Sequence, residues 1–301
     1  MPRSLTVRQT EPSFARCGLE ATVPVAGPNV FRRQLGRRLR RLRDGTAVSV
    51  EQVVANRHLG ISRAKLYKLE AGKHPVKPQD VTALCRYYGA SADETDAMVA
   101  LALATQGDSW WHAHGDDAVP EWFSLYVDLE PAAAVIRTYE AELVPGLLQT
   151  QEYASAVYQA MNVGDSAVEI ERRVAVRMER QAILDRPDPP RLHVVLNEAA
   201  ILCEVGGSAV MTEQVTKLRK AAARPSVTID VLPLAAGAHS AMGWSTFVIL
   251  DFPEPDDDPS VVYLDTPTSA VYLQKAAEVA RYNMIFDRVC NKTIPLLEYT
   301  R

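Results

Sequence analysis

The 301-residue chain contains few cysteines and no long hydrophobic run. Its cysteines, Cys17, Cys85, Cys203 and Cys290, are far apart and form no CxxC pair. This spacing indicates neither a zinc site nor a disulfide framework, and it favours reduced, mostly buried thiols. No apolar stretch approaches the roughly 18 to 20 residues that cross a membrane, and the first residues lack the pattern of a signal peptide. We therefore expect a cytoplasmic protein without a membrane partner.

The known signatures of enzymes are missing as well. The glycines of "EVGG", residues 204–207, are accompanied by neither a P-loop lysine nor the GxGxxG spacing. Cys203 and His239 could form a nucleophile and base, but neither has a flanking signature. The acids of "DLE", residues 128–130, and of "EPDDDP", residues 254–259, are interpreted as solvated loop residues. We expect no enzymatic activity and no cofactor.

A metal site is not expected either. His112 and His114 could ligate a metal, but the sequence places no carboxylate near them at a known ligand spacing. The prediction is that no metal is bound.

Positive charge is concentrated in one segment. Residues 30–77 contain 13 lysines and arginines and 3 acids, a net charge of +10. Because the net charge of the whole chain is −4, the residues outside this segment sum to −14. A basic module is thus joined to an acidic one. The arginines of residues 32–43 could be no more than a solvated face, or they could face a polyanion.

The basic segment has the pattern of a compact helical domain. Residues 1–28 lack periodicity and are interpreted as a disordered tail. We expect helices at residues 31–44, 50–57, 62–71, 77–88 and 92–105, within a DNA-binding domain spanning residues 29–107. Ser49 and Ser62 are candidate N-caps, Val50, Val53 and Val54 form one face of the second helix, and Gly72 ends the third. Two short helices joined by a glycine-containing turn indicate a helix-turn-helix.

The third helix is the candidate recognition helix, which lies in the major groove of DNA. Leu66 and Leu69 are expected to face inward and the basic residues outward. Arg63 is the first candidate for a bidentate guanine contact, and Lys68 is the second. Alternatively, Lys65 and Lys68 are merely solvated. The predicted DNA-binding set is Ser62, Arg63, Ala64, Lys65, Tyr67, Lys68, Arg37 and Lys73, with Arg37 as a phosphate contact.

The stretch "ISRAKLYKLEAG" resembles the Cro/repressor (Xre-type) helix-turn-helix family. The resemblance implies base contacts at Arg63, Ala64 and Lys68, and phosphate contacts near Ser62 and Lys65. The segment "SVEQVVANRHLGIS" departs from the family pattern, because it holds about two more residues between the helices.

The rest of the chain is similar to the large C-terminal domain of actinobacterial Xre-type regulators described as antitoxin-like. The motifs that carry this similarity include "ERRVAVRMERQAIL", "PPRLHVVLNEAAI" and "RPSVTIDVLPLAAGAH". Such regulators are frequently encoded beside a small protein thought to be their partner. The resemblance therefore implies that a small protein encoded by a neighbouring gene is a possible partner.

Residues 108–301 have the pattern of a mixed α/β domain. Runs rich in Val, Ile and Tyr predict strands at residues 134–139, 192–197, 227–232, 246–251 and 261–265, the last two joined as a hairpin. Helices are expected at residues 152–161, 168–184, 210–223 and 276–291. Strands that alternate with helices favour at least some parallel pairing.

Five aromatic residues lie close together at the start of this second domain. They are Trp110, Trp111, Trp122, Phe123 and Tyr126. They could pack the two domains together, or they could form a pocket or a partner surface.

Together the patterns predict a sequence-specific transcriptional regulator that binds double-stranded operator DNA in the nucleoid. Its C-terminal domain would receive a signal from a small protein or a ligand. The alternative is a hydrolase-like enzyme targeted by a helix-turn-helix. Because one module reads few base pairs, we expect a homodimer, held by the helix at residues 168–184 or 276–291.

Overall fold

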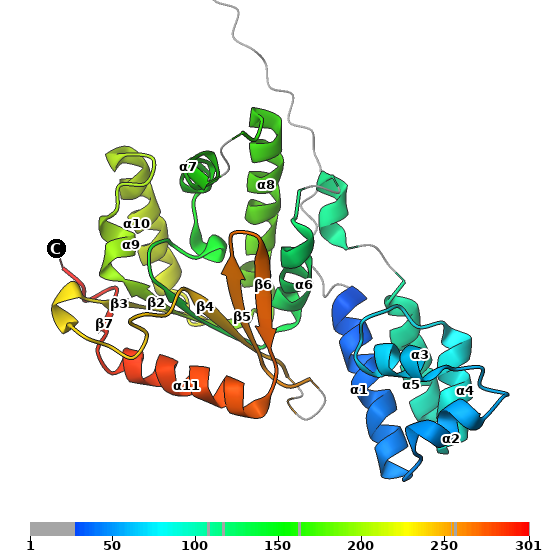
Figure 1. Cartoon of the computed structure of the whole chain (residues 1–301). Coiled ribbons are helices and arrows are strands. Elements are labelled where there is room, and N and C mark those ends of the chain that lie inside the picture. Colours follow the sequence, from blue (N-terminus) through cyan, green and yellow to red (C-terminus); the bar gives the residue numbers. More distant parts are fainter. Residues whose placement is uncertain are drawn as a thin grey trace, which may run out of the picture.

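The computed structural model describes residues 28–106, 109–115, 118–161, 164–253, 255 and 258–300. They form a helical module followed by an α/β domain, the fold class that the sequence predicts (Figure 1). The predicted tail lies outside the described residues except for Pro28, which begins the first helix. None of the described helices is both long and apolar enough to cross a membrane.

The N-terminal module consists of five helices, as predicted. They are α1 (Pro28–Gly45), α2 (Val50–Ala55), α3 (Arg63–Glu70), α4 (Pro78–Tyr88) and α5 (Ala92–Ala104). Ser49 and Ser62 are the N-caps of α2 and α3, and Gly72 follows α3 with a φ of +66°. Val53 is buried as expected, but Val54 is 39% exposed, because the six-residue helix α2 turns it away from the core.

The module closes around one apolar core, to which α1, α3 and α4 each contribute leucines. Leu35, Leu39, Leu66 and Leu84 are at most 1% exposed. Helices α1 and α3 approach closely at Gly36, where an added Cβ would lie 2.4 Å from the carbonyl oxygen of Leu69. The lack of a side chain at this position therefore allows α3 to pack against α1.

The C-terminal domain is built on a seven-stranded sheet with the order β6-β5-β4-β1-β2-β3-β7. Strands β1, β2 and β3 are parallel, and the remaining neighbours pair antiparallel. This confirms the predicted mixed sheet and the β4–β5 hairpin. The strands are β1 (Val135–Glu140), β2 (Arg191–Asn197), β3 (Val227–Leu232), β4 (Phe247–Asp251), β5 (Val261–Thr266), β6 (Ser269–Leu273) and β7 (Ile294–Pro295).

Helices cover both faces of this sheet (Figure 1). One face carries α6 (Glu121–Leu129), α7 (Gln151–Met161), α8 (Ala167–Arg180) and α10 (Ser208–Ala222), whereas α11 (Ala276–Cys290) covers the other. The short helix α9 (Glu198–Leu202) follows β2 directly. The predicted helix at residues 168–184 is divided, because α8 ends at Arg180 and a 3-10 turn continues to Asp185.

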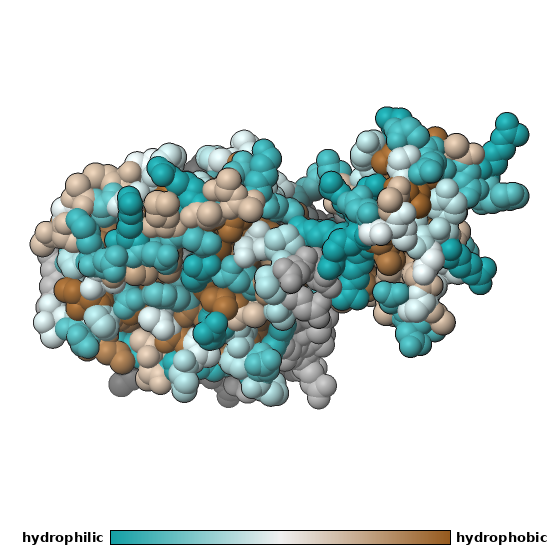
Figure 2. Space-filling view, turned by 90° about the horizontal axis from the view of Figure 1, so that it is seen from below, coloured by the Kyte–Doolittle hydropathy of each residue, from teal (hydrophilic) through white to brown (hydrophobic). Residues whose placement is uncertain are grey.

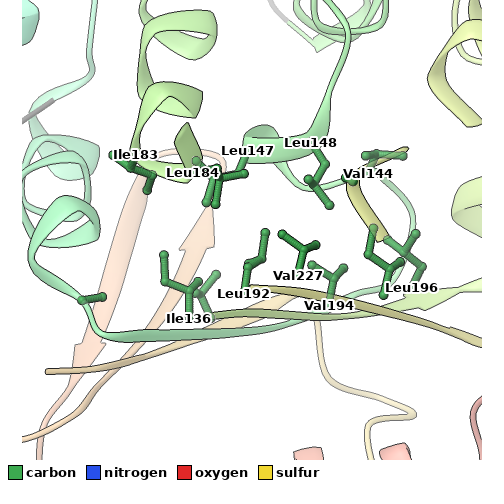
Figure 3. Packing of buried hydrophobic residues seen from close by; sticks show 14 of the residues in the cluster. Ile136, Val144, Leu147, Leu148, Ile183, Leu184, Leu192, Val194, Leu196 and Val227 are labelled. Carbon is green, nitrogen blue, oxygen red and sulfur yellow. The ribbon is translucent and has the colours of Figure 1, made fainter. Parts of the chain in front are cut away.

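The larger core of the domain lies between the sheet and the helices of the first face. Figure 3 shows Ile136, Leu192 and Val194 pointing from β1 and β2 toward Leu147 and Ile183. Alternate residues of the same strands point to α11, where Val195 packs with Phe286. The sheet is thus buried on both sides, which explains the continuous apolar run at residues 247–250 of β4.

Candidate DNA-binding surface and ligand cavity

Helix α3 is held by two leucines and capped by a serine. Leu66 and Leu69 are 0% and 3% exposed, which confirms their predicted inward position. The Ser62 hydroxyl accepts a hydrogen bond from the backbone N–H of Lys65 at 3.2 Å. Helix α2 before it carries a capping box between Ser49 and Gln52. Both helices of the motif therefore have the local signals that begin them.

A buried ion pair fixes the far end of α3. Arg43 of α1 donates to both carboxylate oxygens of Glu70, at 2.6 Å and 2.9 Å. Both residues are 9% exposed, and the bond to Glu70 raises the pKa of Arg43. Because the paired charges form a planar fork, they set the orientation of α3 on α1. Sequence reasoning missed this pair, since the two residues are 27 positions apart.

Most predicted contact residues lie together on the outer side of α3. Ser62, Arg63, Ala64, Tyr67 and Lys68 are exposed, and Lys65 is half-buried. Lys73, just beyond the helix, is also exposed. The space-filling view shows hydrophilic side chains projecting from this module (Figure 2). These seven residues are thus accessible to solvent on α3 or just beyond it.

Two of these cations already have acidic neighbours. Arg63 donates to Glu51 at 2.7 Å, and the ammonium group of Lys65 lies 2.7 Å from Asp80. The Arg63–Glu51 pair is more than half exposed on both sides. Exposed pairs of this kind contribute little stability, so phosphate or a base edge can replace the carboxylate.

Arg37 does not belong to this surface. It lies on the side of α1 turned to the C-terminal domain, where its guanidinium donates to Asp258 at 2.6 Å and to Gln274 at 2.7 Å. The structure therefore corrects its expected position. The apolar stripe of α1 predicts which residues face the core of the helical module. It does not predict whether a residue outside the stripe faces solvent or a neighbouring domain.

Arg37 is part of a larger contact that ties α1 to the C-terminal domain. Arg33 donates to the same Asp258 oxygen at 3.0 Å, and Asn29 donates to Asp128 of α6 at 2.7 Å. Val30, 1% exposed, is packed in the core of the α/β domain. Burial lowers the pKa of Arg33 to about 10 and raises that of Asp258.

Three of the acids interpreted as solvated are in fact buried. Asp128, Glu130 and Asp258 are 0%, 1% and 1% exposed. Glu130 accepts hydrogen bonds from Nε and Nη2 of Arg180, at 2.9 Å and 2.7 Å, and the other two carboxylates face α1. The interpretation was wrong because each carboxylate has a partner distant in sequence, which short local motifs do not reveal.

A cavity made of two hollows lies on the face of the sheet that α6 and α8 cover. Two adjoining hollows of about 390 Å³ and about 480 Å³ lie between the sheet and helices α6 and α8. Both are lined by Phe123, Arg177, Arg180 and Asp265. Pockets of this size hold small organic molecules.

Glu140 at the end of β1 is the most perturbed acid of the cavity wall. It is 7% exposed and accepts a hydrogen bond from the Thr138 hydroxyl at 2.8 Å. Burial, with a smaller contribution from the charge of Asp265, raises its pKa to about 8. Glu140 is therefore largely protonated at neutral pH and presents a neutral O–H group.

The aromatic group divides between this cavity and other packing. Trp122 and Phe123 line the cavity, and Tyr126 stacks on Phe123 with ring centres 5.1 Å apart. Trp111 is 6% exposed in a separate small cluster, and Trp110 packs against it. Trp122 and Phe123 thus line a pocket, whereas the cluster around Trp111 consists of C-terminal-domain residues and does not dock the two domains together.

The other candidate residues do not converge. His114 contacts Glu179 at 2.6 Å, and His112 stacks on Trp111. Cys203 is exposed, and Nδ1 of His239 is buried without a hydrogen-bond partner. Within the described ranges, no group of three or more His, Cys, Asp or Glu residues could hold a metal.

Comparisons with protein families agree with this division of the chain. A family model described as "Domain of unknown function (DUF5753)" matches residues 123–296, more than half of the chain. The chain belongs to the DUF5753 family. A second model, described as "Helix-turn-helix domain", matches residues 34–98. The searches of curated proteins and of solved structures give no match.

Because Asp258 pairs with two arginines of α1, we expect its substitution to lower the free energy of unfolding. In Asp258→Asn, the guanidinium of Arg33, 7% exposed, loses its counter-ion. Removing one partner of a buried pair costs about 3 to 5 kcal/mol. We expect the free energy of unfolding, measured in urea, to fall by this amount, while the exposed control Asp287→Asn changes it by less than about 0.5 kcal/mol. Equal stability of the two variants would contradict the contact.

The raised pKa of Glu140 predicts a pH dependence of stability. Between its ordinary value of 4.5 and about 8, folded Glu140 keeps a proton that the unfolded chain releases. Raising the pH through this window therefore favours unfolding, by at most about 1.4 kcal/mol per pH unit. Glu140→Gln should remove this decline, whereas the exposed control Glu213→Gln should keep it. Urea denaturation from pH 5 to pH 9 measures both, and parallel curves for wild type and Glu140→Gln would refute the burial effect.

Proposed function

We propose that the protein is a sequence-specific, DNA-binding transcriptional regulator that acts in the cytoplasm, at the nucleoid. The observation that carries the proposal is the outer surface of α3, where Arg63, Tyr67 and Lys68 are exposed while Leu66 and Leu69 are buried. A helix of this kind, in a helix-turn-helix, enters the major groove with its first residues at the base edges.

The position of each side chain supports a particular role in binding. Arg63 begins α3 and can form a bidentate contact with guanine, and Ala64 and Lys68 share the groove-facing side. Ser62 and Lys65 lie near the N-terminus of α3, where phosphate is favoured by the helix dipole. Lys73, just beyond α3, adds a further cation for the phosphate backbone of DNA.

We further propose that the DUF5753 domain passes a signal to this module through α1. Helix α6 carries Phe123 and Tyr126 in the cavity wall and also Asp128, which binds Asn29 of α1. Strand β5 carries Tyr263 in the wall, and Asp258, which binds Arg33 and Arg37, lies just before it. The same two elements therefore contact both the cavity and α1.

The cavity supports a small molecule as the source of the signal. A small protein encoded by a neighbouring gene is the partner implied by the resemblance to antitoxin-like regulators. No contact among the described residues specifically supports the enzyme alternative, since Cys203 and His239 are not hydrogen-bonded to each other.

We propose that the regulator acts as a homodimer held by its C-terminal domain. The leucines of α1, α3 and α4 are already buried in the core of the helical module. Helices α8 and α11 have apolar side chains to offer, since Val168 is 54% and Met284 is 44% exposed. Two modules would read two half-sites about 10 base pairs apart.

A pair of substitutions separates base recognition from phosphate binding. Arg63→Ala should weaken binding to the preferred site by about 1 to 3 kcal/mol and relax base choice at one position per half-site. Lys73→Ala should weaken all sequences about equally. Selection of sites from a random duplex library, followed by binding isotherms on selected and scrambled duplexes, measures both effects. Uniform losses for both variants would restrict Arg63 to phosphate contact, and undiminished binding by both would refute the proposed surface.

A further inference from the structure

Arg177 differs from the other arginines around the cavity because no carboxylate in the described part of the chain forms an ion pair with it. Its guanidinium donates to the side-chain oxygen of Gln149 at 2.7 Å and lies 4.3 Å from the centre of the Tyr158 ring. Its Nε is buried with no hydrogen-bond partner. Within the described residues, no carboxylate lies within 4 Å of it, whereas Arg180 binds Glu130 and Arg173 binds Asp165.

Arg177 is half-buried, and a partly buried cation without a counter-ion is costly, because the protein replaces part of the water that would solvate it. The burial of Arg177 accordingly lowers its pKa. An anionic group in the cavity would offset this cost and could accept two parallel N–H donors from the guanidinium. Arg180 is less suited to this role, since its Nε and Nη2 already donate to Glu130, which is its counter-ion.

Two other polar groups of the wall are uncharged donors. Glu140 is largely protonated at neutral pH, and the hydroxyl of Tyr263 is buried without a partner. The carboxylate of Asp265 also lines the cavity, but it is exposed. The anionic end of a ligand therefore has its best position at Arg177, with neutral donors left for other oxygen atoms.

Aromatic side chains supply the rest of the surface. Phe123, Tyr126 and Tyr263 have ring centres 4.5 to 6.0 Å apart, and Trp122 borders the second hollow. Phe123 and Tyr126 are stacked and Tyr263 is tilted to both, so the rings form an apolar, polarisable wall suited to an aromatic ligand. Hollows of about 390 and 480 Å³ have room for one or two fused rings.

We propose that the cavity binds a small aromatic acid, with Arg177 holding the anionic group and Phe123 contacting the ring system. This inference rests on the proposed function and deepens it, because it names the ligand class of the domain that receives the signal.

The test uses the full-length protein and two fluorescent probes with the same ring system. 1-Anilinonaphthalene-8-sulfonate carries an anionic group, and N-phenyl-1-naphthylamine lacks it. The wild-type chain should bind the sulfonate at one site, about tenfold more tightly than the neutral amine. Naphthalene-2-carboxylate should displace the sulfonate, and naphthalene-2-carboxamide should not. Equal affinity for both probes, or equal displacement by both competitors, would overturn the proposal without recourse to any variant.

Three variants assign the effect to one residue. Arg177→Gln should weaken the sulfonate by about tenfold and change the amine less than twofold. Arg281→Gln, an exposed arginine on the opposite face of the sheet, should leave both unchanged. Arg177→Lys keeps the charge and should recover much of the sulfonate affinity, which also guards against a fold defect in the glutamine variant. An unchanged sulfonate affinity in folded Arg177→Gln would overturn the role of Arg177. Because no DNA is present, such a failure leaves the proposed DNA binding standing.

Discussion

Helix α1 belongs to two cores at once, and this constraint joins the two parts of the molecule. Val30 is buried in the α/β domain, while Leu35 and Leu39 are buried in the helical module. Between these ends, Arg33 and Arg37 share the carboxylate of Asp258. Burial of these charges is expensive, as the shifted pKa values of Arg33 and Asp258 indicate. The contact therefore contributes mainly a defined docking position, since buried ion pairs specify geometry better than they stabilise.

The position of α1 also governs the surface proposed to meet DNA. Gly36 lets α3 approach α1, and Arg43 holds Glu70 at the end of α3. A displacement of α1 against the DUF5753 domain would carry α3 with it. The cavity lies beside the same contact, since α6 contributes to both, and Asp258 shortly precedes β5, whose Tyr263 lines the cavity. A ligand that fits one arrangement of these walls better than another would shift the population of α1 positions.

Much of this architecture could be predicted from local patterns. Apolar stripes at helical spacing located the five N-terminal helices, and runs of β-branched residues located five of the strands. Helix α6 was missed, because the aromatic residues in "EWFSLYVDL" leave no clear polar face. Strand β7 has two residues, too few for any pattern.

Site residues could be predicted where their positions follow from neighbours in the sequence. They could not be predicted where their partners lie far away in the sequence. The outward residues of α3 follow from Leu66 and Leu69, which define the inner face within eight residues. Asp258 and Arg33 are 225 positions apart, so neither the burial of one nor the partner of the other can be read from the sequence around it. Arg177 and Glu140 likewise become neighbours of one cavity only when α8 packs over β1.

The central claim is that the DNA-binding surface lies on and beside α3. Acetylation of lysines in the full-length protein, with and without a random-sequence 20-base-pair duplex at low salt, tests it most directly. Lys65, Lys68 and Lys73 lie at the proposed surface, whereas Lys220 and Lys292 are exposed on the DUF5753 domain. The account predicts that DNA removes most of the reactivity of the first three and leaves the other two unchanged. Protection of Lys220 or Lys292, with Lys65, Lys68 and Lys73 still reactive, would contradict it.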